Sequence, residues 1–105
     1  MNKEDQISIC AWAQDTFGTP RKETAVVRML QEIQELTREV LSAKRPKGKR
    51  LSVAKESADV LITLYRIADV YGFSLHSEVD KKMEINRARS WTVTKGVGQH
   101  IKEEA

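Results

Sequence analysis

The chain has 105 residues, a formal net charge of +3 and a single cysteine, Cys10. This length corresponds to one domain, and one cysteine with two histidines excludes an intrachain disulfide and a Cys/His zinc site. The sequence has no apolar run long enough to cross a membrane and no signal-like N-terminus. It therefore predicts a single cytoplasmic domain, residues 1–105, without a membrane partner.

A first helix is predicted over residues 5–17, where apolar side chains recur with helical spacing. Gly18 and Pro20 end it, because glycine favours the position after a helix and proline cannot continue one. For Trp12, a place in the core is the favoured interpretation. The alternative is that its ring forms a wall of a base-binding pocket, since aromatic rings stack on nucleobases.

A second helix is predicted over residues 22–43. Its acids Glu32, Glu35 and Glu39 follow one line of the helix, at i, i+3 and i+7. Taken alone, these acids are best explained as solvated side chains that pair with Arg28 or Arg38.

Residues 43–51 are predicted to form a turn, because Pro46 and Gly48 break helices. The basic residues of this segment give the chain its positive charge: Lys44, Arg45, Lys47, Lys49 and Arg50. This basic loop, residues 44–50, is either simply solvated or attracts an anionic ligand. Nucleic-acid binding is disfavoured as its role, because no aromatic residue is interleaved with the basic ones.

A third helix is predicted over residues 52–71, with Ser52 as its N-cap and Gly72 after its end. Its middle, residues 58–68, is apolar around most of the helix. A helix that is apolar on several sides is buried on several sides. We therefore expect it at the centre of a bundle and in a subunit interface.

Two pairs of carboxylates stand out on the second and third helices: Glu32 with Glu35, and Glu56 with Asp59. The members of each pair are three residues apart and share one helix face. Because burying like charges is costly, two such pairs in apolar helices indicate cations between them. Carboxylate oxygens suit Mg²⁺ or Mn²⁺ better than zinc.

A fourth helix is predicted from residue 74 or 77 to about residue 89, with basic residues at its end. Residues 92–105 show no clear period and are predicted to be a flexible tail, and no strand is expected anywhere. The predicted fold class is therefore all-α, a four-helix, bundle-like arrangement with short connections.

The acidic pairs Glu-x-x-Glu at 32–35 and Glu-x-x-Asp at 56–59 resemble the signature of the MazG-like all-α nucleoside triphosphate pyrophosphohydrolases. The pattern Lys-x-x-x-Asn-x-x-Arg at 82–89 resembles the element that follows the acidic helices in that superfamily. Residues 9–18 and 82–91 are similar to the small dATP/dGTP pyrophosphohydrolase branch, which occurs in bacteria and phages. The resemblance spans about residues 7–91.

The resemblance implies that a deoxynucleoside triphosphate, dGTP or dATP, is cut between its α and β phosphates to give the monophosphate and pyrophosphate. The apolar third helix predicts at least a homodimer, and the resemblance makes a homotetramer plausible; the setting is the cytoplasm, that of the host if the protein is phage-encoded. Two or three Mg²⁺ or Mn²⁺ ions per site would be held by Glu32, Glu35, Glu56 and Asp59. The implied substrate contacts are Lys82, Asn86 and Arg89, with Trp12 near the base and an ending, Lys95 to His100, that resembles the branch.

A carboxylate that is not fully used in metal binding can accept the proton of the attacking water, and Glu35 and Glu39 are the candidates. One alternative is the same fold acting on dCTP, dUTP or phosphoribosyl-ATP. A second is a non-catalytic helical module that binds nucleic acid through the basic loop, with salt-sensitive affinity. A third, a structural bundle with solvated acids, does not explain Asp59, which directly precedes the most apolar run.

Overall fold

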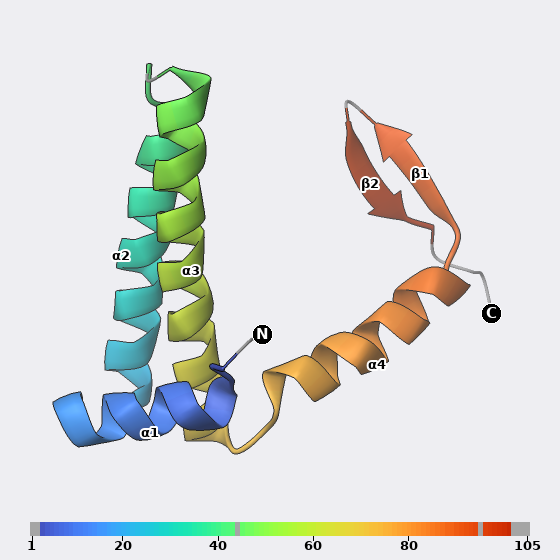
Figure 1. Ribbon diagram of the computed structural model, residues 1–105. Coiled ribbons are helices and arrows are strands. Elements are labelled where there is room, and N and C mark those ends of the chain that lie inside the picture. Colours follow the sequence, from blue (N-terminus) through green and yellow to red (C-terminus); the bar gives the residue numbers. More distant parts are fainter. Residues whose placement is uncertain (1–2, 44, 95, 102–105) are drawn as a thin grey trace. The chain divides into compact units, whose positions relative to one another are not determined.

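The computed structural model describes residues 3–43, 45–94 and 96–101. These residues form four helices and two strands: α1 (Gln6–Phe17), α2 (Lys22–Leu41), α3 (Pro46–Tyr71), α4 (Leu75–Ala88), β1 (Trp91–Thr94) and β2 (Val97–His100) (Figure 1). They belong to two compact units, Met1–Leu75 and His76–Ala105. The described residues are thus mostly helical, as predicted, and none of their helices is long and apolar enough to span a membrane.

Helix α1 begins and ends as the sequence indicates. The Asp5 carboxylate accepts a hydrogen bond from the backbone N–H of Ser8 at 2.8 Å, and the Ser8 hydroxyl accepts one from the backbone N–H of Asp5 at 2.9 Å. This reciprocal capping satisfies two backbone donors at the start of the helix. Gly18 follows the last residue with φ of 80°, a conformation that favours glycine.

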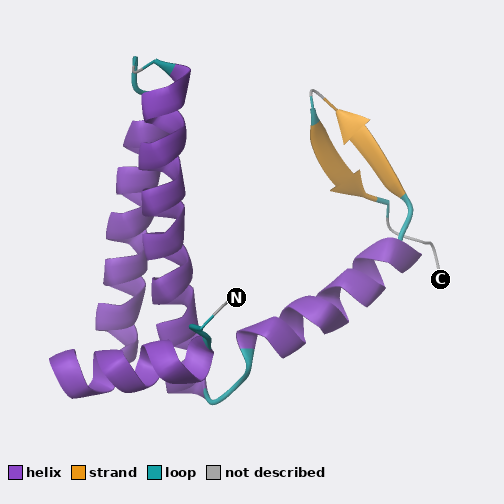
Figure 2. Cartoon of the chain, viewed as in Figure 1, coloured by secondary structure: helices purple, strands orange, loops and turns teal. Residues whose placement is uncertain are grey.

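Helices α2 and α3 form an antiparallel pair, and α1 lies across one end of it (Figures 1 and 2). The residues of α2 that face α3 recur at helical spacing and are buried or half-buried: Ala25, Met29, Glu32, Leu36 and Glu39. Few residues of the described chain are buried, and all are small: Cys10, Ala13, Ala25, Thr63 and Ala68. The first unit therefore has a thin core, to which α1, α2 and α3 all contribute.

The predicted turn at 43–51 is wrong for most of its length, because α3 already begins at Pro46. Proline is favoured in the first turn of a helix, where its missing N–H has no partner to lose. Gly48 costs a helix only about 1 kcal/mol. Most of the predicted basic loop is therefore the first turns of α3, and Lys44 lies outside the described residues.

The expectation that the chain contains no strand is also wrong. In the second unit, β1 and β2 form an antiparallel hairpin in which Trp91 pairs with His100 and Thr94 with Val97. The indole N–H of Trp91 donates to the carbonyl oxygen of Asn86 at 2.8 Å, which joins the hairpin to α4. Aromatic and β-branched residues favour strands, but a run of four gives little signal. The predicted flexibility of residues 92–105 stays a prediction.

Candidate active site

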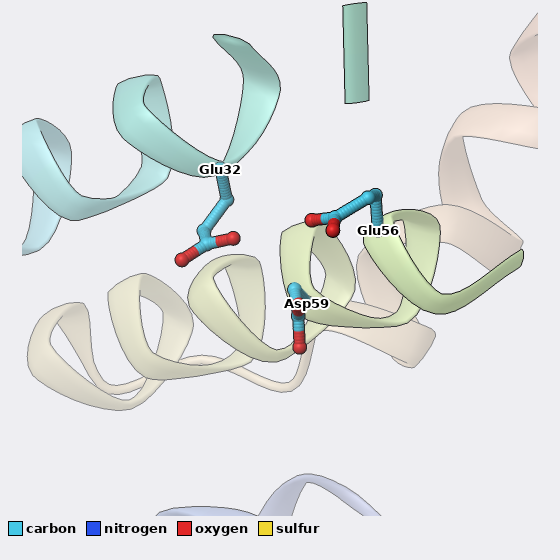
Figure 3. Close-up of side chains that lie close together, drawn as sticks. All are labelled: Glu32, Glu56 and Asp59. Carbon is cyan, nitrogen blue, oxygen red and sulfur yellow. The ribbon is translucent and has the colours of Figure 1, made fainter. Parts of the chain in front are cut away.

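Three carboxylates from two helices lie together in the α2–α3 pair. Helix α2 supplies Glu32, and α3 supplies Glu56 and Asp59, one turn apart. One oxygen atom of each residue lies within 4.8 Å of the others (Figure 3). All three side chains are half-buried. The antiparallel pair thus brings together three of the four residues predicted as metal ligands.

The other two acids of the predicted site, Glu35 and Glu39, lie on α2 but outside this group. Glu35 is half exposed, and its carboxylate accepts a hydrogen bond from Nη1 of Arg38 at 2.8 Å. Glu39 is half-buried one turn further along α2. Glu32 also pairs with Arg28, at 3.3 Å. Both ion pairs expected for solvated surface acids are therefore present, but they do not explain why Glu32 lies beside two carboxylates of α3.

The electrostatics of the cluster favour a cation. Burial raises the pKa of Glu56 above its ordinary value, and the neighbouring negative charges, chiefly that of Asp59, raise it further, against an opposing effect of Lys55. A raised pKa means that the ionised form of Glu56 is disfavoured in its present surroundings. Converging carboxylate oxygens are the ligands that Mg²⁺ and Mn²⁺ prefer. The donor set therefore fits a hard divalent ion.

A pocket of about 780 Å³ adjoins the carboxylates, and Glu32 and Asp59 are among its lining residues. From α1 and the following turn it is lined by Trp12, Ala13, Phe17, Gly18, Thr19, Pro20 and Arg21. From α2 and α3 it is lined by Thr24, Ala25, Arg28, Ile62, Thr63 and Arg66. This volume is in the usual range of pockets for small molecules. A ligand in it would touch the acids and the aromatic side chains of α1.

The favoured interpretation of Trp12 as a core residue is wrong, because its side chain is 57% exposed in the described chain. Its ring meets that of Phe17 edge-on, with centroids 5.5 Å apart. Both rings line the pocket. The arrangement agrees with the alternative interpretation, in which Trp12 forms a pocket wall.

Arg28 and Arg66 line the pocket but were not among the predicted site residues. A signal for them exists in the sequence. Arg28 lies one turn before Glu32, and Arg66 lies two turns after Asp59, so each shares a helix face with a clustered acid. Their helical spacing from Glu32 and Asp59 would therefore have identified both arginines as candidate site residues.

The predicted substrate-contacting residues of the C-terminal part belong to the second unit. Lys82, Asn86 and Arg89 follow helical spacing, with Arg89 just beyond the end of α4. Lys95 lies outside the described residues, and of His100 only the backbone is described. Their contact with substrate stays a prediction.

The fold and the site define a helical protein with a candidate hard-cation centre beside a small-molecule pocket. No family model matches the chain. A dATP/dGTP diphosphohydrolase of cyanophage S-2L is 31% identical over 99 residues, which cover 93% of this chain and 86% of the relative. A solved structure, the cyanophage S-2L MazG-like pyrophosphohydrolase bound to dGDP and three catalytic Mn²⁺ ions per active site, is also 31% identical. The match has a TM-score of 0.70 and covers 94% of this chain and 91% of the chain in the solved structure.

The chain belongs to the MazG-like pyrophosphohydrolases, as this identity over most of both chains establishes. It is thus a metal-dependent nucleoside triphosphate pyrophosphohydrolase, and the family and enzyme class predicted from the acidic motifs are confirmed.

Proposed function

We propose that this enzyme hydrolyses dGTP and dATP between the α and β phosphates, releasing the deoxynucleoside monophosphate and pyrophosphate. The observation that carries the proposal is the cluster of Glu32, Glu56 and Asp59 at a pocket of about 780 Å³. The preference for purine deoxynucleotides is supported by the activity named for the similar cyanophage enzyme.

The clustered carboxylates are proposed to hold two or three divalent ions, Mg²⁺ or Mn²⁺, with Glu35 as a fourth ligand. The three Mn²⁺ ions of the similar structure support this number. When bound, such ions neutralise phosphate oxygens and lower the pKa of a coordinated water. The charge of Glu35 contributes to the raised pKa of Glu56, which supports a place for Glu35 in the same electrostatic environment. It would give up its pair with Arg38 on binding them.

The proton of the attacking water needs an acceptor, and we propose Glu35 or Glu39 for this role. A carboxylate that is not fully used in metal binding can accept a proton through its second oxygen. Comparing pH profiles of Glu35→Gln and Glu39→Gln would tell the two apart, because loss of the base removes the acidic limb of the profile.

The nucleoside is proposed to occupy the pocket with its base against Trp12, since base–aromatic stacking is available to every base. Phosphate and sugar contacts are proposed for Lys82, Asn86 and Arg89, and for Lys95 and His100 of the C-terminal segment. Their resemblance to the motif of the branch supports this assignment. We also propose that residues 1–105 act together as a single MazG-like domain.

The enzyme is further proposed to act in the cytoplasm as a homodimer, or as a homotetramer of two such dimers. Helix α2 carries a stripe of residues spaced alternately four and three apart, which is apolar except at Thr37. Its aliphatic members are each 39–55% exposed: Val26, Leu30, Ile33 and Val40. Helix α3 carries an exposed apolar stripe with similar spacing: Leu51, Ala54, Ala58 and Leu61. This spacing is that of helices packing against helices. A second copy of the pair would complete a four-helix bundle.

The test is a pyrophosphate-release assay on the purified protein with each nucleoside triphosphate, in Mg²⁺, in Mn²⁺ and in EDTA. We expect release from dGTP and dATP, none in EDTA, and a loss of at least about a hundredfold in Glu56→Gln. Glu23→Gln removes an exposed acid from the start of α2 and should retain full activity. Greater release from dCTP or dUTP would overturn the purine preference. No release from any of them would direct the test to phosphoribosyl-ATP and then to nucleic-acid binding by residues 44–50.

A further inference from the structure

The turn between α1 and α2, residues 18–21, forms one wall of the pocket, and Arg66 of α3 holds it. Nη2 of Arg66 donates a hydrogen bond to the carbonyl oxygen of Gly18 at 3.0 Å. Its guanidinium carbon lies 5.9 Å from the centre of the Phe17 ring. One side chain thus links the end of α1 to α3, across 48 positions of sequence.

Arg66 lies on the same face of α3 as Asp59. Two helical turns separate them, a distance of about 10 Å along the axis. Ile62 and Thr63 lie between them, and all four residues line the pocket. Helix α3 therefore carries a clustered carboxylate at one position along the pocket and the anchor of the turn at another.

The geometry at Gly18 shows why this anchor matters. The φ of Gly18 is 80°, which ends the regular helix, and its N–H donates to the carbonyl oxygen of Gln14 at 2.9 Å. Its own carbonyl oxygen has left the helical ladder and takes its hydrogen bond from Arg66. A planar guanidinium can donate to a carbonyl and lie beside an aromatic ring at once, whereas an ammonium group offers a single point of charge.

We propose that Arg66 is a positioning residue for the nucleoside part of the substrate. It sets the place of this wall, the turn of residues 18–21 with the Phe17 ring beside it, relative to the carboxylates. This inference rests on the proposed function, because a nucleotide held at the acids through its phosphates has to place its base at a fixed reach from them. Without the anchor the wall shifts, and nucleotide affinity and base preference fall while the acids keep their geometry.

The experiment compares Arg66→Met, which keeps the length of the side chain, with Arg66→Lys, which keeps the charge. The matched control is Lys22→Met. Nζ of Lys22 lies 4.9 Å from the ring centre of Tyr71 and so also ties α2 to the end of α3, but Lys22 does not line the pocket. For each protein, kcat and KM are measured for dGTP, dATP and dCTP. Mn²⁺ affinity is measured without nucleotide by electron paramagnetic resonance, and folding by circular dichroism.

For Arg66→Met we expect KM for dGTP to rise about tenfold with kcat within about twofold, since the contact contributes equally before and during the chemical step. The preference for dGTP over dCTP should shrink, and Mn²⁺ affinity should equal that of the wild type. Arg66→Lys should recover part of the affinity, and Lys22→Met should behave as wild type.

Unchanged KM and base preference in a folded Arg66→Met would overturn the inference. So would a loss of Mn²⁺ affinity that accompanies the rise in KM, because the change would then reach the carboxylates themselves. A wild-type protein that binds Mn²⁺ but releases no pyrophosphate from any nucleotide would overturn the proposed function, and this inference with it.

Discussion

Helix α2 presents two faces of different chemistry. The face toward α3 carries Glu32 and Glu39, half-buried beside Met29 and Leu36. The other face carries large aliphatic side chains that nothing in the described chain covers fully: Val26, Leu30, Ile33 and Val40. In an ordinary amphipathic helix the acids would lie outside and the aliphatic residues inside.

Each face is energetically incomplete in the single metal-free chain. Half-buried carboxylates lose hydration without an opposite charge of sufficient strength, and exposed aliphatic surface forgoes about 25 cal/mol for each Å² left in water. Divalent cations would complete the inner face, and a second copy of the helix pair would complete the outer one. On this proposal the inner face serves catalysis and the outer face serves assembly, so that each can be altered alone.

The largest effect should come from the inner face. Asp59→Asn and Glu32→Gln each remove a negative oxygen ligand, so kcat/KM for dGTP should fall by at least about a hundredfold, measured as pyrophosphate release. Asp69→Asn changes an exposed acid further along α3 and should leave kcat/KM unchanged. Full activity in Asp59→Asn would show that the carboxylates of the inner face do not hold the catalytic ions.

On the outer face, Ile33→Glu places a charge in the apolar stripe and should dissociate the oligomer. Sedimentation at micromolar concentration should then give the mass of one chain, 12.0 kDa, where the wild type gives a multiple of it. Gln34→Glu introduces the same charge at the next, exposed position and should keep the wild-type mass. A wild type that itself sediments at 12.0 kDa would leave the stripe without its proposed partner.

A smaller effect concerns pH. Because the pKa of Glu56 is raised in the folded protein, the metal-free folded state binds this proton more tightly than the unfolded chain does. The resulting stabilisation is complete below the ordinary value of 4.5 and is lost as pH rises through the higher folded value. In EDTA at neutral pH, Glu56→Gln should therefore melt at a higher temperature than wild type.

Thermal melts at several pH values check this point, since the difference between the two proteins should vanish below pH 4.5. Mn²⁺ should raise the melting temperature of the wild type and have less effect on Glu56→Gln. Equal melting of both proteins in EDTA at neutral pH would show that the acids do not strain the inner face.

The smallest effect should come from the ion pair at the edge of the inner face. Arg28→Gln removes the partner of Glu32, and because the Arg28 side chain is 61% exposed, the free energy of unfolding should fall by no more than about 0.5 kcal/mol. Urea denaturation measures this, with Arg38→Gln as the matched change at Glu35. A loss of several kcal/mol would mean that Arg28 supports the helix pair itself.

The cluster of Glu32, Glu56 and Asp59 was largely predictable from the sequence, because Glu56 and Asp59 share a helix face and a short connection brings α3 back against α2. The same spacing also predicted Glu35, which lies outside the cluster and is half exposed. The start of α3 was not predictable in this way, because proline breaks a helix in its interior but favours the first helical position, where Pro46 lies. The hairpin at Trp91–His100 was missed because its strands are too short to show an alternating pattern.

Local periodicity also could not place Trp12, because an aromatic residue on an apolar stripe fits a core and a pocket wall equally well. The role proposed for Arg66 depends on its hydrogen bond to Gly18, 48 positions away, and a local sequence pattern does not reveal such a contact. Which residues share a helix face follows from spacing, whereas what lies opposite that face follows only from the fold.

Glu32, Glu56 and Asp59 are proposed to bind the divalent ions together, and the most direct test is a Mn²⁺ titration followed by electron paramagnetic resonance. The wild type should bind Mn²⁺ without nucleotide. A variant with Glu32→Gln, Glu56→Gln and Asp59→Asn should lose this binding, while Glu23→Gln keeps it. Equal Mn²⁺ binding by the triple variant and the wild type would contradict the claim, because the ions would then be held elsewhere.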